Sequence, residues 1–370
     1  MRIGPFRIEN YFVKHEFSAK YLLASSDCES RSIGEVLQLE PGADERLREL
    51  WCGYTEAPGA RELREAIAGI YARVNADDVL VLSCAEEGIF DLYHALLSAE
   101  DHVIVETPCF ESGLEVARST GAQVSEWRRR AADDWKHDLH ALEKLVRHNT
   151  KVLYINTPHN PTGLLMRRDI FDAVMQLAAR HGMTVFCDEV YRELEHDAAT
   201  RLPAACDVYE HAVSLGSMSK VYGLPGLRLG WLATRDAEIL RRCQEFRLYT
   251  TICNSAPSEF LCAVALRHRE VLVKRNLEIV RTNLALLDAF FARRGEIFDW
   301  VRPDASPIGF ARFKPSRDVQ EFCDEVVSKS GVMLLPGSVY DEARHVRFGY
   351  GRKNMPEALE EFEKYLKANW

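Results

Sequence analysis

The sequence predicts an α/β protein with a mostly parallel central sheet. Two observations support this prediction. Short apolar segments with strand character alternate with amphipathic helical segments along most of the chain, and this order is typical of parallel sheets that helices cover. The composition is 47% hydrophobic and 28% charged, which is ordinary for a globular protein. A length of 370 residues suggests about two domains.

The predicted elements follow one another at short intervals from the N-terminus. Aromatic and charged positions alternate over residues 6–24, which predicts a short amphipathic helix or arm. Strands are predicted at 79–82, 102–106, 121–125, 152–155, 184–187, 212–215, 229–233, 332–335 and 345–350, with two more between 298 and 314. Helices are predicted at 33–39, 44–50, 89–97, 134–147, 169–181, 236–249, 271–294, 318–328 and 355–368, with another beginning near residue 63. The segment 254–257 is expected to break the helical region.

Charge and cysteine content exclude several classes of function. The formal net charge is -9, and the short basic run Arg128–Arg130 is interpreted as a solvated loop, so nucleic acid is not expected as a partner. The ten cysteines include no Cys-x-x-Cys pair, and His137 and His140 lack a third ligand, so these two histidines are expected on a solvated helix face and no metal site is predicted. No signal peptide or membrane span is recognised, which favours a cytoplasmic protein.

The stretch around Lys220 carries the strongest chemical signal. It reads Ser217-Met218-Ser219-Lys220, continues into a Gly/Pro-rich loop, and reaches Arg228 eight positions after the lysine. These side chains could converge on one phosphorylated ligand. A lysine amine that condenses with a carbonyl is a common covalent catalyst, and pyridoxal 5'-phosphate (PLP) supplies such a carbonyl. The alternative is a surface lysine beside an ordinary turn.

Two further segments fit a phosphorylated cofactor. The strand 79–82 is followed by a turn of small residues and a helix, a geometry that points the backbone N–H groups of Ala85 and Glu86 at a phosphate. Asp188 follows the strand 184–187, and the carboxyl end of a strand is a favoured place for a functional side chain.

The Lys220 stretch resembles the lysine motif of the class I/II aminotransferases, which are fold-type I PLP-dependent enzymes. The matching pattern is Ser-x-x-Lys followed by Pro-Gly-x-Arg. The resemblance implies that Lys220 bonds covalently to PLP while Ser217 and Arg228 hold the cofactor phosphate. It also implies that Phe110, two residues after a proline, stacks on the pyridine ring. Tyr54 would reach the phosphate of a partner subunit.

Other motifs extend this resemblance. Asn160 lies in an Asn-Pro-Thr-Gly turn, and Asp188 and Tyr191 form Asp-x-x-Tyr. The resemblance implies that Asn160 and Tyr191 bind the phenolic oxygen of PLP and that Asp188 pairs with its ring nitrogen. Arg347, on the last predicted strand, would bind the α-carboxylate of the substrate in the bidentate manner that suits a guanidinium group.

The resemblance, which runs from Tyr54 to Arg347, also predicts organisation and activity. It implies a large PLP-binding domain at 44–270 and a smaller α+β domain built from 1–43 and 271–370, with helices on both faces of the central sheet. A homodimer is expected. The implied reaction moves an amino group between an amino acid and a 2-oxo acid.

Departures from the family pattern leave alternatives. Cys84 stands where a glycine is usual, and Glu86 stands where a small or amide residue is usual. A carboxylate near a phosphate is unfavourable unless it points away, so the backbone amides of Ala85 and Glu86 are the expected ligands.

The arm at residues 8–35 looks like that of capreomycidine-synthase-type PLP enzymes. This suggests a lyase or cyclase that acts by β-elimination on a hydroxylated or β-substituted amino acid. A regulatory PLP-binding protein is less favoured, because only about forty residues precede the expected cofactor domain. An acyl-transferring synthase is disfavoured by the Pro225–Arg228 loop.

Overall fold

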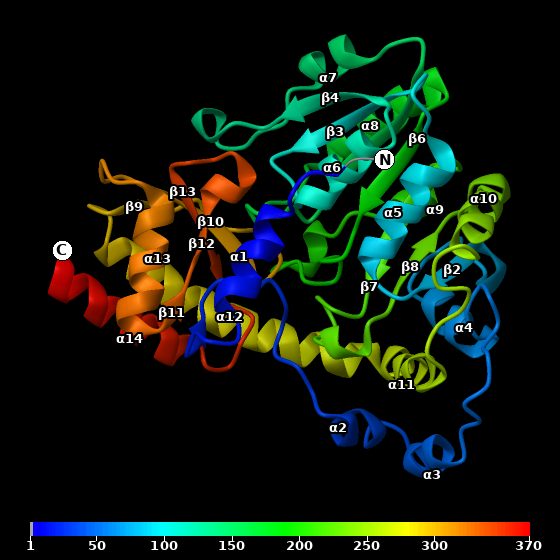
Figure 1. Ribbon diagram of the computed structural model, residues 1–370, viewed down its shortest axis with the longest axis horizontal. Coiled ribbons are helices and arrows are strands. Elements are labelled where there is room, and N and C mark those ends of the chain that lie inside the picture. Colours follow the sequence, from blue (N-terminus) through cyan, green and yellow to red (C-terminus); the bar gives the residue numbers. More distant parts are fainter. Residues whose placement is uncertain (1–2) are drawn as a thin grey trace.

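A seven-stranded sheet forms the centre of the protein, as seen in the computed structural model, which describes residues 3–370 (Figure 1). All neighbouring strands are parallel except where β8 meets β2 and β7, so the sheet is mostly parallel, as predicted. In spatial order the strands are β2 (Val79–Leu82), β8 (Gly230–Ala233), β7 (Ala212–Ser217), β6 (Thr184–Asp188), β5 (Thr150–Asn156), β3 (His102–Thr107) and β4 (Gln123–Arg128).

Alternating side chains of the central strands pack into two apolar layers. On β5, Tyr154 belongs to one cluster of buried residues, and its neighbour Ile155 belongs to the other. Because both faces of the sheet are covered, the side chains on both faces are apolar. These strands therefore have continuous apolar sequences. Helices α5 (Ala85–Leu96), α6 (Glu111–Ser119) and α10 (Ala237–Arg247) contribute to the Tyr154 layer, and α7 (Leu139–Leu145), α8 (Arg168–His181) and α9 (Ala205–Val208) contribute to the Ile155 layer.

A second, smaller region lies beside the central sheet. Its four-stranded antiparallel sheet has the order β12 (Leu335–Pro336), β13 (His345–Gly349), β10 (Ile308–Phe313) and β9 (Phe298–Asp299), and the accompanying helices are α13 (Val319–Ser330) and α14 (Met355–Asn369). Helix α12 (Arg269–Arg293) directly follows α11 (Ala256–Arg267), which packs on α4 (Arg61–Ala68), and Figure 1 shows it running from there to the smaller region. The predicted domain boundaries near residues 44 and 270 remain predictions.

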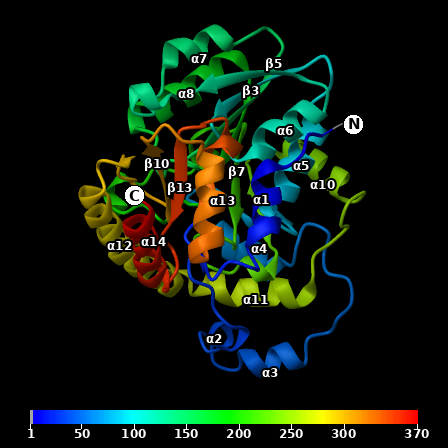
Figure 2. The same cartoon turned by 60° about the vertical axis from the view of Figure 1, so that its left-hand side comes forward.

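The N-terminal segment connects the two regions. Helix α1 (Arg7–His15) lies between α13 and the α5–α6 pair (Figure 2). Strand β1 (Tyr21–Leu22) then pairs in parallel with β11 (Val332–Met333) of the smaller region. Helices α2 (Ile33–Leu37) and α3 (Ala43–Arg48) pack against α11.

Two predicted elements differ from the structure. The helix expected at 134–147 begins only at Leu139, because Asp134 and Trp135 have positive φ angles of 52° and 58°. The Trp135 side chain is 1% exposed, and its burial outweighs the helical pattern. The strand expected at 332–335 is two short strands in different sheets, β11 and β12.

Helix α11 was not predicted. Its first residues were interpreted as a break, but Ser255 accepts a hydrogen bond from the Ser258 N–H and Pro257 occupies the first turn, so both start the helix. In the part of the chain from residue 3 onward, no helix combines the length and the apolar character that crossing a membrane requires.

Candidate active site

A cavity of about 470 Å³ lies between the carboxyl end of β7 and helix α1. It is lined by several residues that the sequence analysis singled out and by others that it did not. The lining residues from the central region are Cys84, Ala85, Glu86, Phe110, Val190, Ser217, Ser219, Lys220, Pro225 and Arg228. Those from the N-terminal segment and the smaller region are Phe6, Glu9, Phe12, Glu16, Ser25, Ser26, Asp27 and Arg352.

Lys220 places its amine in this cavity. The lysine follows β7 by three residues, and its Nζ donates a hydrogen bond of 2.9 Å to the Ser26 hydroxyl. Burial lowers the pKa of Lys220, which increases the fraction of the neutral amine. A neutral amine is the nucleophilic form of lysine, so the site suits reaction with an aldehyde.

The wall beside Lys220 fits a phosphate. Ser217 ends β7, and its hydroxyl accepts a 3.1 Å hydrogen bond from the Ser219 N–H. Arg228 lines the same wall, and the first N–H groups of α5 begin at Ala85, after a cap that makes no side-chain hydrogen bond. Gly230 permits this approach, because a Cβ there would lie 2.7 Å from the Ala85 nitrogen. Free helix N–H groups beside an arginine and hydroxyls match the phosphate of PLP.

Glu86 lines the cavity, and its carboxyl group is close enough to Asp188, Glu9 and Lys220 for their charges to affect it. Burial, followed by the nearby Asp188 and Glu9 carboxylates, raises the pKa of Glu86 to about 7. Near neutral pH a large fraction of the Glu86 carboxyl groups is therefore uncharged. This lessens the repulsion between Glu86 and a bound phosphate that the sequence analysis expected. The backbone amides of Ala85 and Glu86 remain the proposed ligands.

Asp188 is buried at the carboxyl end of β6. Its carboxylate accepts hydrogen bonds from the Tyr154 hydroxyl at 3.0 Å and the Val190 N–H at 3.2 Å. Burial raises the pKa of Asp188 to about 6, so a cationic ring nitrogen would relieve the cost of its charge. Tyr191, three residues on, is 1% exposed, and its hydroxyl makes no hydrogen bond within residues 3–370. A buried orphan hydroxyl is expected to find a partner in a bound ligand.

Asn160 and Arg347 lie together behind the cavity. The Asn160 Oδ1 accepts hydrogen bonds from the Tyr340 hydroxyl at 3.0 Å and from Arg347 Nη1 at 3.4 Å. The Asn160 turn fits against the smaller region because Gly163, with φ of 71°, has no Cβ, which would lie 2.3 Å from the Ile308 carbonyl oxygen. The structure thus joins two predicted residues that are 187 positions apart.

Phe110 and Tyr54 have different surroundings. Phe110 lines the cavity, and its ring centroid lies 5.2 Å from that of Phe6. Tyr54 is 87% exposed and lines a separate surface hollow with Trp51, so this chain does not bring it to its own Lys220.

The residues missed by sequence reasoning come mainly from the segment before α2. Ala24 accepts a 2.8 Å hydrogen bond from Arg347 Nη2 through its carbonyl, Ser26 binds the Lys220 amine, and Asp27 forms a 2.8 Å ion pair with Arg352. One short stretch therefore contacts each of these cations. The sequence signals were the alternation of aromatic and charged residues before this stretch and the likeness of the arm at residues 8–35, and neither indicated a partner residue.

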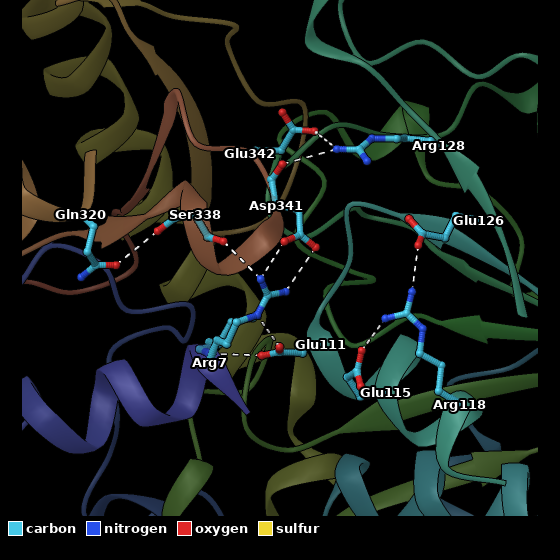
Figure 3. Close-up of polar contacts among 11 residues, drawn as sticks. Arg7, Glu111, Glu115, Arg118, Glu126, Arg128, Gln320, Ser338, Asp341 and Glu342 are labelled. Carbon is cyan, nitrogen blue, oxygen red and sulfur yellow. Dashed lines mark hydrogen bonds and ion pairs between the residues drawn. The ribbon is translucent and has the colours of Figure 1, made fainter. Parts of the chain in front are cut away.

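Helix α1 is held in place by Arg7 (Figure 3). The Arg7 Nε lies 2.7 Å from Glu111 Oε1 on α6, and its Nη1 lies 2.7 Å from Asp341 Oδ1, directly after the 3₁₀ helix η5 (Gly337–Tyr340). In the same view Arg118 pairs with Glu115 and Glu126, all within the central region. Arg7 therefore attaches the α1 wall to both regions at once.

Two expectations about polar side chains were wrong. Arg129, expected in a solvated loop, is 3% exposed and lies 3.3 Å from the Glu106 carboxylate. His137, expected on a solvated helix face, precedes the helix and has its Nε2 2.8 Å from the same carboxylate. Glu106 is buried and also accepts the Asn156 N–H. Its charge requires these partners, because a buried carboxylate is costly unless it is paired.

Comparisons with known proteins agree with this geometry. Capreomycidine synthase of Streptomyces vinaceus is 27% identical over 93% of this chain and 88% of its own length. Aspartate aminotransferase of Thermotoga maritima is 26% identical over 89% of this chain and 88% of its own length.

Solved structures are similar over almost the entire chain. A PLP-dependent aminotransferase from Streptococcus suis superposes with a TM-score of 0.94 at 27% identity, covering 100% of this chain and 99% of the other. The PLP-dependent cyclase OrfR superposes with a TM-score of 0.92 at 28% identity, with the same coverage. These neighbours show the fold-type I architecture and PLP as the cofactor. The model of aminotransferase class I and II matches residues 20–362, and the chain therefore belongs to that family.

Proposed function

We propose that the protein transfers an amino group between an amino acid and a 2-oxo acid. The observation that supports this most is the meeting of the Lys220 amine, the phosphate-type wall of Ser217 and Arg228, and the Phe110 ring in one cavity. The family to which the chain belongs includes relatives named as aminotransferases, such as that of Thermotoga maritima.

The residues have distinct proposed roles. When PLP is bound it withdraws electrons from the substrate Cα. Lys220 Nζ accepts the proton from that carbon as a general base and returns it later. Asp188 holds the proton on the ring nitrogen, and Asn160 and Tyr191 bind the phenolic oxygen. Arg347 binds the substrate carboxylate.

A second copy of the chain is proposed to complete the site. Trp51 and Tyr54 are 79% and 87% exposed, and Tyr249, in the loop before α11, is 92% exposed. Exposed aromatic side chains are enriched at protein interfaces. In a homodimer Tyr54 would reach the phosphate held by the partner chain. A reducing cytoplasmic setting is proposed from the cysteines, all ten of which are free.

Amino acids supplied without any acceptor test the proposed transfer. The cofactor absorbance should shift to that of its amine form and stop there, and a 2-oxo acid should reverse the change. Repeated turnover with the aldehyde form retained would contradict amino transfer.

A second candidate is a lyase or cyclase that expels a β-leaving group. It is favoured by the likeness to capreomycidine synthase and to the cyclase OrfR, each over nearly the whole chain. Turnover of a hydroxylated or β-substituted amino acid with no acceptor, monitored by the released group, would select this reaction.

A further inference from the structure

Tyr154 is a buried residue of the central sheet whose hydroxyl reaches the carboxyl end of β6. It lies on β5 opposite Phe186 of β6, and its side chain is fully buried. Asp188 is two residues beyond Phe186, so Tyr154 and Asp188 are diagonal neighbours on one face of the sheet. The Tyr154 hydroxyl donates a 3.0 Å hydrogen bond to Asp188 Oδ2 across this diagonal. Tyr154 therefore contacts the carboxylate and not the cavity, which it does not line.

The surrounding structure leaves room for this tyrosine and fixes its ring. Helix α6 carries Gly113 beside the ring, and a Cβ there would lie 2.8 Å from two ring carbons of Tyr154 and 3.1 Å from its hydroxyl. The ring centroid lies 5.6 Å from that of Phe186, in a T-shaped arrangement, and 6.4 Å from that of Tyr93. Gly113 thus gives the ring its space, and the neighbouring rings hold the hydroxyl at Asp188.

Asp188 depends on few donors from the protein. Its Oδ1 accepts a 3.2 Å hydrogen bond from the Val190 N–H, and Tyr154 is the only side chain within residues 3–370 that donates to it. Burial raises the pKa of Asp188, and the hydrogen bonds from Val190 and Tyr154 lower it. A buried carboxylate is costly unless donors satisfy it. Since each oxygen accepts one of these bonds, the carboxylate keeps acceptor capacity for a further donor.

A second tyrosine in the same apolar layer shows a hydroxyl with a purely structural partner. Tyr93, on α5, is also fully buried, and its hydroxyl donates a 3.0 Å hydrogen bond to the Gly113 carbonyl. This bond satisfies a buried polar group and involves no titratable side chain. The Tyr154 hydroxyl differs, because its acceptor is the carboxylate assigned to the ring nitrogen of PLP.

We infer that Tyr154 is a positioning residue, which keeps Asp188 ionised and oriented for the ring nitrogen of PLP. The inference rests on the proposed role of Asp188, and it applies to amino transfer and to elimination alike. When PLP is bound, the proton that an ionised Asp188 holds on the ring nitrogen strengthens electron withdrawal from the substrate. Hydrogen bonds to charged groups are among the stronger ones in proteins, so loss of the Tyr154 hydroxyl should be measurable.

Tyr154→Phe tests the inference because it removes one oxygen atom and keeps the ring. The PLP dissociation constant, measured on the cofactor-free protein by quenching of its fluorescence, should rise about 3- to 10-fold. In the PLP-loaded enzyme, kcat for the best amino-acid substrate should fall about 10-fold, whereas KM should change by less than about 2-fold. A residue that only supported the fold would not separate kcat from KM in this way.

Tyr93→Phe is the matched control. It removes the hydroxyl of an equally buried tyrosine in the same layer, so any general cost of the substitution should appear in both variants. The PLP dissociation constant and kcat of Tyr93→Phe should stay within about 2-fold of the parent values, because Asp188 keeps both of its donors.

A double-mutant cycle tests whether Tyr154 acts through Asp188. In an Asp188→Asn background, Tyr154→Phe should change the PLP dissociation constant and kcat by less than about 2-fold, because the charge that the hydroxyl stabilises is absent. Parent values in Tyr154→Phe, an equal loss in Tyr93→Phe, or the full loss in the Asp188→Asn background would overturn the inference.

The same variants separate the inference from the proposed function. If Asp188→Asn loses activity while Tyr154→Phe does not, the proposed role of Asp188 stands and only the inference fails. If Asp188→Asn keeps the parent values, the role of Asp188 fails and the inference fails with it. If the expected losses occur in an enzyme that eliminates a β-leaving group and transfers no amino group, the inference stands and the proposed function fails.

Discussion

The two walls of the cavity are built in different ways. The wall with Ser217, Lys220 and Arg228 stands at strand ends of the central sheet and beside the N-terminus of α5. The opposite wall consists of α1 and the segment after it, which are attached by a few polar contacts such as those of Arg7. The sheet-built wall carries residues that match the family motifs, whereas Glu9 and Glu16 on the α1 wall belong to none of those motifs. The two walls thus come from separate parts of the chain.

The strongest test of the sheet-built wall is removal of its amine. Lys220→Ala should lower turnover by about 1000-fold or more, because both the covalent attachment and the proton transfer depend on Nζ. Steady-state kinetics with the best amino donor measures this loss. Borohydride reduction should fix the cofactor to Lys220 in the parent protein only.

Lys274→Ala, at an exposed position on α12, is the control and should keep its activity. Substantial turnover in Lys220→Ala would place the reactive group elsewhere and remove the distinction between the two walls.

Glu86 determines how sharply the two walls differ in charge. Its pKa in the folded cofactor-free protein is about 7, above the ordinary value of 4.5. Between these values the folded state holds the proton and the unfolded state does not, so this group reduces the free energy of unfolding as pH rises from 4.5 to 7. Glu86→Gln should make the fall in the free energy of unfolding between pH 4.5 and 7 smaller by roughly 1–2 kcal/mol, after allowance for the partial exposure of the side chain.

Urea unfolding of the cofactor-free protein at pH 5 and pH 8 measures the effect. Glu115→Gln, outside the cavity, should keep the pH dependence of the parent protein. If the free energy of unfolding of Glu86→Gln depends on pH in the same way as that of the parent protein, Glu86 is already ionised at pH 5. The phosphate-type wall would then be acidic too.

Arg7 tests whether the attachment of α1 affects substrate alone. Arg7→Ala should raise the KM for the amino donor about 2- to 5-fold and leave the PLP dissociation constant unchanged. The exposed pair with Asp341 contributes at most about 1 kcal/mol, and the buried Glu111 keeps the Ile8 N–H as a hydrogen-bond donor. Arg118→Ala removes two more exposed ion pairs that lie within the central region. An equal rise in KM for Arg118→Ala would show that α1 is not the cause.

The sequence predicted the sheet-built wall well because its signals are local. Ser217, Lys220 and Arg228 are close together in the chain, and the strand, turn and helix that place Ala85 are consecutive. Nearly every central strand was also identified, since a strand buried on both faces has a continuous apolar run. The family resemblance added Asn160 and Arg347, which the structure places in contact.

The remaining features depend on contacts between distant residues. Glu106 accounts for the burial of Arg129 and His137, but nothing near either residue indicates that partner. Glu9, Glu16 and Ser26 likewise carry no motif. The pairing of β1 with β11 and the Arg7 ion pairs, all with distant residues, hold their segment beside Lys220. The role of Tyr54 still requires a second chain.

The segment from Ala24 to Asp27 also constrains the order in which the molecule can assemble. Its contacts with Lys220, Arg347 and Arg352 join residues 194, 323 and 325 positions apart. During synthesis this segment leaves the ribosome long before its three partners do. Contacts of such long sequence separation form late, because a large loop must close before they contribute. A nascent chain can therefore fold much of its central sheet while the Lys220 amine still lacks its surroundings, so these contacts are complete only after Arg347 and Arg352 have been synthesised.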